Sequence, residues 1–194
     1  MDYSALLKKR RSIRFYQQKP VAEKHLVKMV QAALHAPSAA NNQVLRYTII
    51  RNQDLVQAVF HHTRYGGRVT PKRSPKWGDN APTAFIAVSA VKNGSEISPA
   101  VYADAGAAIM SMLFAAVEEN LGTCWIGAFN GKEVAQLLET PANEQLLYLI
   151  AVGHPAESPV EETIRKNESV AYYLDEYDRL HVPKYEFEAV TKIM

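Results

Sequence analysis

The sequence predicts one domain in which a β-sheet is covered by helices on both faces. Patterns typical of strands alternate with patterns typical of helices along the chain, and this order indicates a layered fold. Two segments, 84–90 and 146–152, are almost entirely apolar, as expected of strands in the middle of a sheet. The chain has 194 residues, 47% of them hydrophobic, which suffices for one substantial core but not for two full domains. We therefore expect a single domain over residues 1–194.

Composition limits the classes of partner and compartment. The formal charge of +2 is spread over both halves of the chain, so nucleic acids and anionic membranes are poor partners. A single cysteine, Cys124, excludes an intramolecular disulfide and favours a reducing compartment. The N-terminus lacks the apolar run of a signal peptide, and the longest uncharged helical stretch, 105–117, is shorter than the roughly 18 apolar residues of a membrane span. We expect a cytoplasmic protein in which 105–117 is a buried core helix.

Two helices are predicted at the N-terminal end. The first covers 4–9 with Ser4 as its N-cap. The second begins at Pro20 and is stopped by Pro37, because the residue before a proline leaves the helical region. Its apolar residues recur at helical spacing and predict a stripe that faces the core: Leu26, Met29, Val30, Ala33 and Leu34.

A strand, a helix and a long loop follow. Segment 46–51 alternates well enough to be a strand, and Asp54 is expected to cap a helix that runs to His62. Residues 63–80 are rich in glycine, proline and cations and are predicted to be a loop. Loops of this length often cover ligands, so Trp77 and Lys76 are candidates for that role.

The next helix, 101–120, is expected at the centre of the fold because its first half carries small residues all round. Gly122 is predicted to end it as a C-cap, and 123–129 to form a short strand that leads into a turn. Asn130 and Glu133 then form a capping box for another helix.

The C-terminal part ends with a charged, tyrosine-rich segment. The helix after Asn130 is expected to face inward through Val134, Leu137 and Leu138. Strand 146–152 is predicted to stop at 153–155, with His154 in a turn. Segment 157–194 has little core of its own and at most a helix over 169–180, so we expect it to lie over another body.

A basic cluster follows the first helix and reads Arg10, Arg11, Ser12, Ile13, Arg14, Phe15, Tyr16. One guanidinium group can donate two parallel hydrogen bonds to the oxygens of a phosphate, so these cations and the hydroxyl suit a phosphate. In an extended backbone Arg10, Ser12 and Arg14 would point one way, and the residues between them would point toward the core. The alternative is a charged helix end favoured by the helix dipole.

The segment from Ser38 to Gln43 is small and rich in hydrogen-bonding side chains, which suits close approach of a flat ligand to the backbone. The alternative is an ordinary C-terminal turn with an asparagine in the left-handed conformation.

Several familiar sites are excluded. The sequence has no complete phosphate loop, no Gly-x-Gly-x-x-Gly fingerprint and no Gly-x-Ser-x-Gly nucleophile elbow. His61 and His62 have no partners at ligand spacing, so we expect a polar helix end and no metal site. Cys124 is predicted to be a packing residue, because nothing adjacent would lower the pKa of its thiol.

In order and spacing, the motifs of this chain resemble those of the flavin-dependent nitroreductases. The resemblance spans roughly residues 5–170. The motifs that carry it are Arg10 to Arg14, Ala36 to Gln43, Asp104 to Ala107, Leu121 to Gly127, and Val152 to Glu157. The chain departs from many relatives at Val44 and Leu45, where those relatives carry Pro-Trp.

The resemblance implies an α+β fold with three layers, α/β/α, around a mixed and mainly antiparallel sheet. It also implies an intertwined homodimer in which 157–194 extends over the partner subunit, and FMN bound at the subunit interface. The residues that correspond to its FMN-binding positions are Arg10, Arg11, Ser12 and Arg14 from one subunit, Pro37, Ser38 and Asn41 from the other, Gly127 and Ala128 beside the reactive edge, and Arg165 and Lys166 as the last phosphate-binding cations.

The function implied is an FMN-dependent oxidoreductase that moves hydride from NADH or NADPH to nitroaromatics, quinones or similar flat acceptors. No side chain is expected to act as a strong acid or base, because the flavin carries the chemistry. Alternatives within the family are a flavin reductase, an enoate-type reductase and a reductive dehalogenase. The alternative from another class is a nonredox module that binds a phosphorylated ligand or RNA through the basic cluster.

Overall fold

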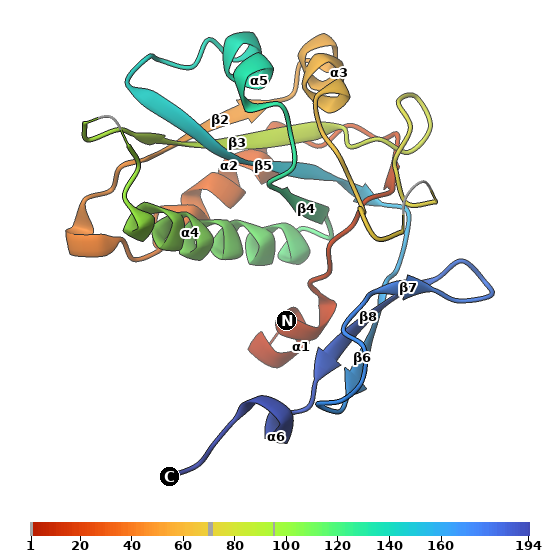
Figure 1. The fold of residues 1–194 in the computed structure, drawn as a ribbon. Coiled ribbons are helices and arrows are strands. Elements are labelled where there is room, and N and C mark those ends of the chain that lie inside the picture. Colours follow the sequence, from red (N-terminus) through yellow and green to blue (C-terminus); the bar gives the residue numbers. More distant parts are fainter. Residues whose placement is uncertain (1, 70–71, 95) are drawn as a thin grey trace.

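A computed structural model of the chain describes residues 2–69, 72–94 and 96–194. A central sheet lies between two layers of helices, and a smaller sheet near the C-terminus stands apart from this body (Figure 1). The three-layer α+β fold expected from the sequence is confirmed.

The central sheet is built around its longest strand, β5. Its strands are β1 (Tyr16–Gln17), β2 (Leu45–Ile50), β3 (Ala84–Val91), β4 (Gly122–Ile126) and β5 (Glu144–Pro155). One edge of β5 pairs with β3, which in turn pairs with β2; the other edge pairs first with β4 and then, at its end, with β1. The pairings between these strands are antiparallel, and an isolated parallel bridge joins Ser12 to Thr123.

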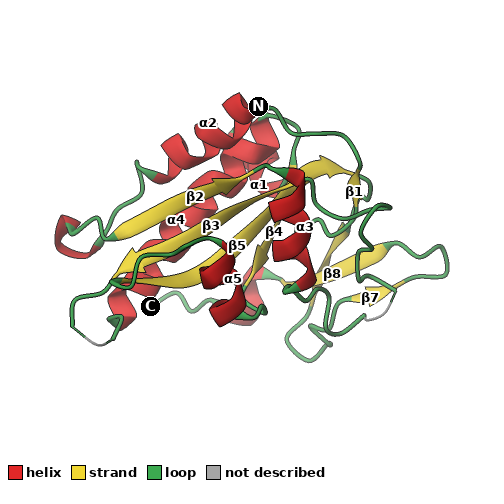
Figure 2. Ribbon diagram, turned by 90° about the horizontal axis from the view of Figure 1, so that it is seen from above, coloured by secondary structure: helices red, strands yellow, loops and turns green. Residues whose placement is uncertain are grey.

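Helices cover both faces of this sheet (Figure 2). The helices are α1 (Tyr3–Lys9), α2 (Glu23–Ala33), α3 (Gln53–His61), α4 (Pro99–Glu118) and α5 (Gly131–Leu137), with a 3₁₀ turn, η1 (Ala39–Asn41), after α2. One hydrophobic core lies between the sheet and α2 with α4, and a second lies between the sheet and α3 with α5. Both faces of β3 are therefore covered, which explains why its sequence is almost entirely apolar.

Helix α4 is the central helix that the sequence predicts. Its length and composition would suffice to cross a membrane, but half of its apolar window is buried inside the molecule. Small residues such as Ala105 and Ala108 are fully buried where α4 approaches its neighbours. The expectation of a buried core helix over 105–117 is confirmed.

Helix boundaries differ from the predicted ones at several caps. Asp2, which accepts the N–H of Ala5 at 2.8 Å, caps α1 in place of Ser4. Asn52, which accepts the N–H of Leu55 at 3.0 Å, caps α3 in place of Asp54. In both cases a better-placed side chain two residues upstream takes the N-cap position.

The ends of α2 and α4 also differ. Helix α2 begins at Glu23, three residues after Pro20, and Leu34 falls beyond its last residue and is 68% exposed. Gly122 does not cap α4, because Asn120 takes the left-handed conformation there with φ of 56° and Gly122 opens β4.

Only one half of the predicted capping box forms: the side chain of Asn130 accepts the N–H of Glu133 at 3.4 Å, while the N–H of Asn130 donates to the carbonyl of His62. Helix α5 faces inward through Val134, but Leu137 is exposed. Strand β5 continues past the predicted end at 152 and ends at Pro155, and His154 pairs with Gln17 of β1. His154 is therefore a strand residue, and burial lowers the pKa of its imidazole.

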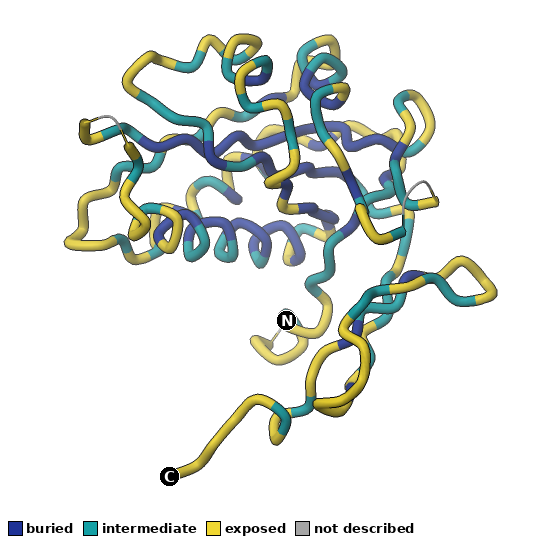
Figure 3. Tube along the Cα trace, viewed as in Figure 1, coloured by how far each residue is buried: buried dark blue, intermediate teal, exposed yellow. Residues whose placement is uncertain are grey.

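The C-terminal segment forms a small sheet in place of the helix expected over 169–180. Its elements are β6 (Val160–Ile164), β7 (Tyr173–Leu174), β8 (Leu180–Tyr185) and a short helix α6 (Phe187–Val190). Strand β8 pairs parallel with β6 and antiparallel with β7. Most of this segment is exposed (Figure 3).

Candidate functional site

A cavity of about 630 Å³ opens where β4 ends. Its walls come from the end of α3, from the loop that follows α3, from the residues after β4, and from Arg14. The cations Arg14 and Arg64 and the apolar side chains of Phe60 and Ile126 all line it. The volume lies within the roughly 300–1,000 Å³ typical of small-molecule sites.

Arg14 reaches this cavity because its neighbours anchor the basic cluster in the core. Ile13 and Tyr16 are buried, and each packs against a glycine where an added Cβ would lie within 3 Å of the side chain, at Gly122 and Gly153 respectively. The N–H of Ile13 donates to the carbonyl of Thr123 at 2.8 Å, and the Tyr16 hydroxyl donates to the carbonyl of Ile13. The cluster is thus an extended segment fixed against β4 and β5.

The predicted alternation of this segment holds only in part. Ile13 points into the core as expected, but Arg11 does not: its guanidinium pairs with Glu161 of β6 at 2.7 Å and is 11% exposed. Arg10 is half-buried, and burial lowers the pKa of its guanidinium. The alternative of a charged helix end does not describe the segment, because α1 stops at Lys9 and Arg10 is already extended.

The backbone of Arg14 is held by a buried carboxylate. Glu157 accepts the N–H groups of Arg14 and of Phe15, and its side chain is 6% exposed. The guanidinium of Arg14 lies 5.5 Å from the ring centroid of Tyr172 in the C-terminal segment.

Gly127 and Ala128 line the same cavity directly after β4. The carbonyl of Ala128 accepts the N–H of Arg64 at 2.9 Å, which ties the loop after α3 to this wall. Trp125, 36% exposed, packs edge-on against Tyr148 with the ring centroids 5.1 Å apart.

Cys124 also borders the cavity but is buried, and burial raises the pKa of its thiol to about 11. A thiol with so high a pKa is a poor nucleophile at neutral pH. The prediction that Cys124 is a packing residue is confirmed.

The segment after Pro37 is a strained turn held by α4. The buried carboxylate of Asp104 accepts the N–H of Ala39 at 2.9 Å. Ala40, Asn41 and Gln43 all have positive φ, between 48° and 54°. The left-handed asparagine of the alternative interpretation is present at Asn41, but it is only one of three such residues, and clusters of this kind occur at ligand-binding sites.

Within one chain the structure does not bring all expected site residues together. Arg14, Gly127 and Ala128 share one cavity, whereas Pro37 and Ser38 line another of about 170 Å³ beside Asp104. The expected site takes these two groups from different subunits. A single chain therefore leaves that expectation untested.

Other expected residues lie elsewhere. Arg11 borders a third cavity of about 310 Å³ together with Lys8 and Lys9. Arg165 and Lys166 are exposed in the turn after β6, where the N–H of Arg165 donates to Glu168.

The sequence interpretation missed the wall formed by Phe60 and Arg64. The available signal was the position of Arg64 directly after a helix and before the paired glycines Gly66 and Gly67. The ring of Trp77 packs against Phe60 with the centroids 5.8 Å apart, and Ser74 and Pro75 of the same loop border the cavity. That Trp77 and Lys76 cover a ligand stays a prediction. Among the described residues, no group of three or more histidine, cysteine, aspartate or glutamate side chains could hold a metal ion.

Comparison with known proteins identifies the family. The model of the nitroreductase family matches residues 7–154. The FMN reductase [NAD(P)H] of Bacillus subtilis strain 168 is 31% identical over 200 residues, covering 91% of this chain and 76% of that protein.

Solved structures agree. A nitroreductase family protein from Clostridium novyi NT has a TM-score of 0.69 at 24% identity, covering 81% of this chain and 87% of that one. A protein from Desulfovibrio desulfuricans, solved in complex with FMN, has a TM-score of 0.65 at 29% identity, covering 82% of this chain and 89% of that one. Because the family model matches well over half of the sequence, this chain belongs to the nitroreductase family.

Proposed function

We propose that this protein is an FMN-dependent oxidoreductase that takes hydride from NADH or NADPH and passes it to nitroaromatics, quinones or similar flat acceptors. The family, the FMN reductase relative and the FMN-bound neighbour support the cofactor and the reaction class. The single observation in the structure that carries the proposal is the meeting of Arg14 with Gly127 and Ala128 in one cavity.

The chemistry of the cavity walls fits a flavin nucleotide. FMN combines a flat, largely apolar ring with a phosphate that carries nearly two negative charges. Phe60 and Ile126 offer apolar surface, and Arg14 and Arg64 offer charge. Charge-assisted hydrogen bonds contribute about 1.5–3 kcal/mol each, so a few of them hold such a cofactor without a covalent link.

We assign the phosphate, the ribityl chain and the pyrimidine edge to Arg10, Arg11, Ser12 and Arg14, with Arg165 and Lys166 as further cations. Gly127 and Ala128 would lie beside the reactive edge, where a backbone N–H can donate to the ring. Pro37, Ser38 and Asn41 would come from a second subunit, since the turn that carries them lies in a different cavity from Arg14. The site is therefore proposed to form in a homodimer.

The bound cofactor supplies hydride transfer. The side chains of this chain bind and orient the flavin, and Arg14 keeps a fixed positive charge in the cavity. Since Cys124 is buried and burial raises the pKa of its thiol, we assign it no nucleophilic role. The two substrates would use the same space in turn, which gives ping-pong kinetics.

The first test is the colour of the purified protein. We expect it to be yellow, and to bleach when NADH or NADPH is added without oxygen. An anaerobic screen of acceptors, followed by reoxidation of the flavin, then finds the substrate class. A colourless protein that cannot be reconstituted with FMN would contradict the proposal and favour a nonredox binding module.

A second test concerns Arg14 itself. Arg14→Ala should weaken FMN binding by about 1.5–3 kcal/mol, the value of one charge-assisted hydrogen bond. The control is Arg51→Ala, which removes an exposed cation paired with Glu23 on another surface. Equal FMN dissociation constants in the two variants would remove Arg14 from the site.

A further inference from the structure

Two charged side chains behind Arg14, those of Glu157 and Arg73, are buried but do not line the cavity. Glu157 follows β5, and its side chain is 6% exposed. Arg73 comes from the loop after α3, and its side chain is 11% exposed. Their closest atoms, Nη1 of Arg73 and Oε2 of Glu157, are 3.6 Å apart.

The side chain of Glu157 accepts backbone N–H groups of the basic cluster that would otherwise need a carbonyl of a neighbouring strand. Ile13 donates its N–H to Thr123 of β4, and Tyr16 pairs with Pro155 of β5. Between these contacts the N–H groups of Arg14 and Phe15 donate to one carboxylate oxygen, Oε1 of Glu157, at 2.5 and 3.2 Å. Successive N–H groups that converge on one anion fix the local backbone, and with it the direction in which the Arg14 side chain leaves it.

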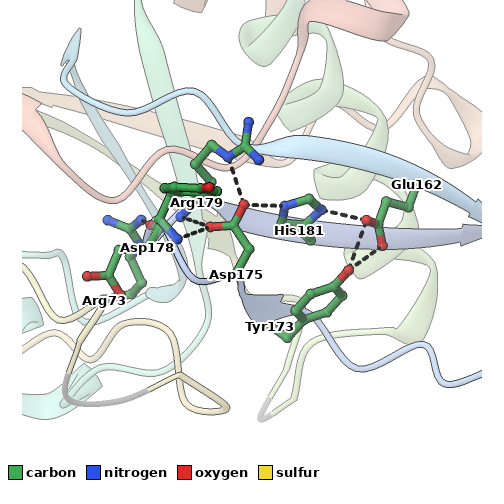
Figure 4. A network of polar contacts seen from close by, with 8 residues as sticks. Arg73, Glu162, Tyr173, Asp175, Asp178, Arg179 and His181 are labelled. Atoms are coloured by element: carbon green, nitrogen blue, oxygen red, sulfur yellow. Dashed lines mark hydrogen bonds and ion pairs between the residues drawn. The ribbon is translucent and has the colours of Figure 1, made fainter.

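Arg73 compensates this buried carboxylate and joins three parts of the chain. Its guanidinium lies 4.9 Å from the ring centroid of Phe15, faces Glu157, and donates to the carbonyl of Asp178. Asp178 belongs to the turn between β7 and β8, next to the polar network of Asp175 and His181 (Figure 4). The adjacent Lys72 also pairs with Asp178, at 3.1 Å.

The distance of 3.6 Å between Arg73 and Glu157 is too long for a good hydrogen bond, so this ion pair is unlike one that serves stability alone. In the part of the chain that the structure describes, Nε of Arg73 and Oε2 of Glu157 are buried and make no hydrogen bond. A buried ion pair with unsatisfied atoms is poorly suited to add stability. What the ion pair does achieve is to hold Glu157 where its carboxylate fixes the backbone of Arg14.

We infer that Glu157 and Arg73 are positioning residues for the flavin site: Glu157 fixes the backbone of Arg14, and Arg73 holds Glu157 in place and couples it to the C-terminal segment. This inference rests on the proposed function, in which Arg14 contacts FMN.

The test is a double-mutant cycle on FMN binding with Arg14→Ala and Glu157→Gln. The loss of FMN from diluted holoprotein is followed by flavin fluorescence, and the midpoint potential of the bound flavin is measured in the same variants. Glu157→Gln keeps the shape and one acceptor oxygen but loses the charge that faces Arg73. We expect it to raise the FMN dissociation constant about tenfold in the wild-type background and less than about twofold in the Arg14→Ala background, because residues that act through one another are not additive. The midpoint potential of the bound flavin should shift in the same direction in both single variants, Glu157→Gln and Arg14→Ala.

Controls separate positioning from folding. Glu144→Gln removes another partly buried carboxylate, which accepts from Ser89 at 2.5 Å and does not line the cavity. It should leave FMN binding and the potential unchanged. Arg73→Lys keeps the charge and should restore most of the binding that Arg73→Gln loses. If Glu157→Gln does not fold, this Arg73 pair supplies the same comparison.

Additive effects of Glu157→Gln and Arg14→Ala, or equal losses in Glu157→Gln and Glu144→Gln, would overturn the inference. These outcomes differ from failure of the proposed function, in which the wild-type protein itself binds no FMN.

Discussion

Two glycines decide where the basic cluster lies. A Cβ at Gly153 would stand 2.7 Å from the Tyr16 ring and 3.1 Å from its Cβ, and one at Gly122 would stand 2.9 Å from the side chain of Ile13. The ring base of Tyr16 cannot swing away as the end of a long side chain could. Residues that do not themselves line the cavity therefore set the approach of Arg14 to it.

Gly153→Ala should lower the free energy of unfolding by about 1–3 kcal/mol, the usual cost of overpacking a core. It should also weaken FMN binding, since Tyr16 and the cluster must shift. Denaturant titration and flavin fluorescence measure the two effects. Gly131→Ala is the matched control, because Gly131 does not line the cavity and its added Cβ would make only an ordinary contact, 3.7 Å from the Phe129 side chain. Unchanged stability in Gly153→Ala would show that the cluster adapts without cost.

The residue scale also shows what the sequence could and could not predict. The basic cluster and the residues after β4 were predicted as site candidates, and the structure places Arg14, Gly127 and Ala128 in one cavity. The role of Glu157 was not foreseen, because a contact across 143 positions has no local pattern. Caps were missed for a related reason, since neighbouring polar residues such as Asp2 and Ser4 compete for the same position.

At the scale of elements, the turn η1 depends on α4. Left-handed residues other than glycine are costly, at about 1–2 kcal/mol each, and the segment has Ala40 and Asn41 within η1 and Gln43 just after it in this conformation. Asp104 offsets part of that cost by accepting the N–H of Ala39.

Asp104→Ala should destabilise the protein by about 1.5–3 kcal/mol, the value of a hydrogen bond to a charged group, while Asp104→Asn keeps an acceptor oxygen and should cost less. Hydrogen exchange of the 38–43 amides should rise in Asp104→Ala. Unaltered exchange there would mean that the turn holds its shape without α4.

The small C-terminal sheet contains a histidine between two carboxylates. Nδ1 of His181 faces Glu162 at 2.5 Å, Nε2 faces Asp175 at 3.1 Å, and the Tyr173 ring stacks on the imidazole at 5.0 Å between centroids. Hydrogen bonding to Asp175 raises the pKa of His181; burial opposes this, and Glu162 adds to it. Burial pushes the pKa of Asp175 up, but hydrogen bonds from Arg179, His181 and Tyr177 outweigh it and hold that pKa well below its usual value.

The signs of these shifts predict a pH dependence. A raised folded-state pKa means that His181 stabilises the sheet fully below its unfolded pKa of about 6.5 and loses that effect as the pH rises through the folded value. Asp175 acts in the opposite sense, and its contribution is lost only as the pH falls below about 3.9 toward its folded value. We expect the C-terminal segment to be cleaved faster by protease at pH 9 than at pH 6. His181→Gln should abolish the difference, and an NMR titration of His181 with a midpoint at or below about 6.5 would contradict the account.

The helix expected over 169–180 does not form, because pairing of this segment with a strand further along the chain outweighs its local preference for a helix. Tyr173 and Leu174 pair with β8. The carboxylate of Asp175 accepts the N–H groups of Tyr177 and Arg179 and closes the turn between the strands. Such pairing partners are invisible in a window of a few residues.

For the whole molecule, the exposed C-terminal segment supports assembly. Tyr177 is 72% exposed, Phe187 61% and Ile193 86%, and Figure 3 shows this segment as largely uncovered. Large apolar side chains gathered on one segment indicate a surface that a partner covers. We propose that the partner is a second copy, which also brings Ser38 of one subunit toward Arg14 of the other.

Size-exclusion chromatography with light scattering should give twice the 21.7 kDa mass of the chain. Deleting residues 186–194 should raise the dimer dissociation constant at least about tenfold, because one large buried side chain is worth about 1.5–3 kcal/mol. Leu137→Ser, which changes an exposed apolar side chain on α5, is the control. A monomer that retains FMN would contradict the shared site.

The layered fold was predictable as a whole, because the periods of its strands and helices differ and the central strands are apolar. The order of the strands was not, since it depends on which distant segments pair with β5.

The position of β5 late in the chain has a consequence during synthesis on the ribosome. Strands β1 and β4 both pair with β5, yet β1 is made first and β5 is the last strand of the central sheet to be made. The Arg14 segment and the wall after β4 must therefore wait for residue 155 to emerge before either is fixed in place. A nascent chain stalled near residue 140 would carry an open sheet edge, and it should be bound by chaperones that a chain stalled beyond β5 escapes.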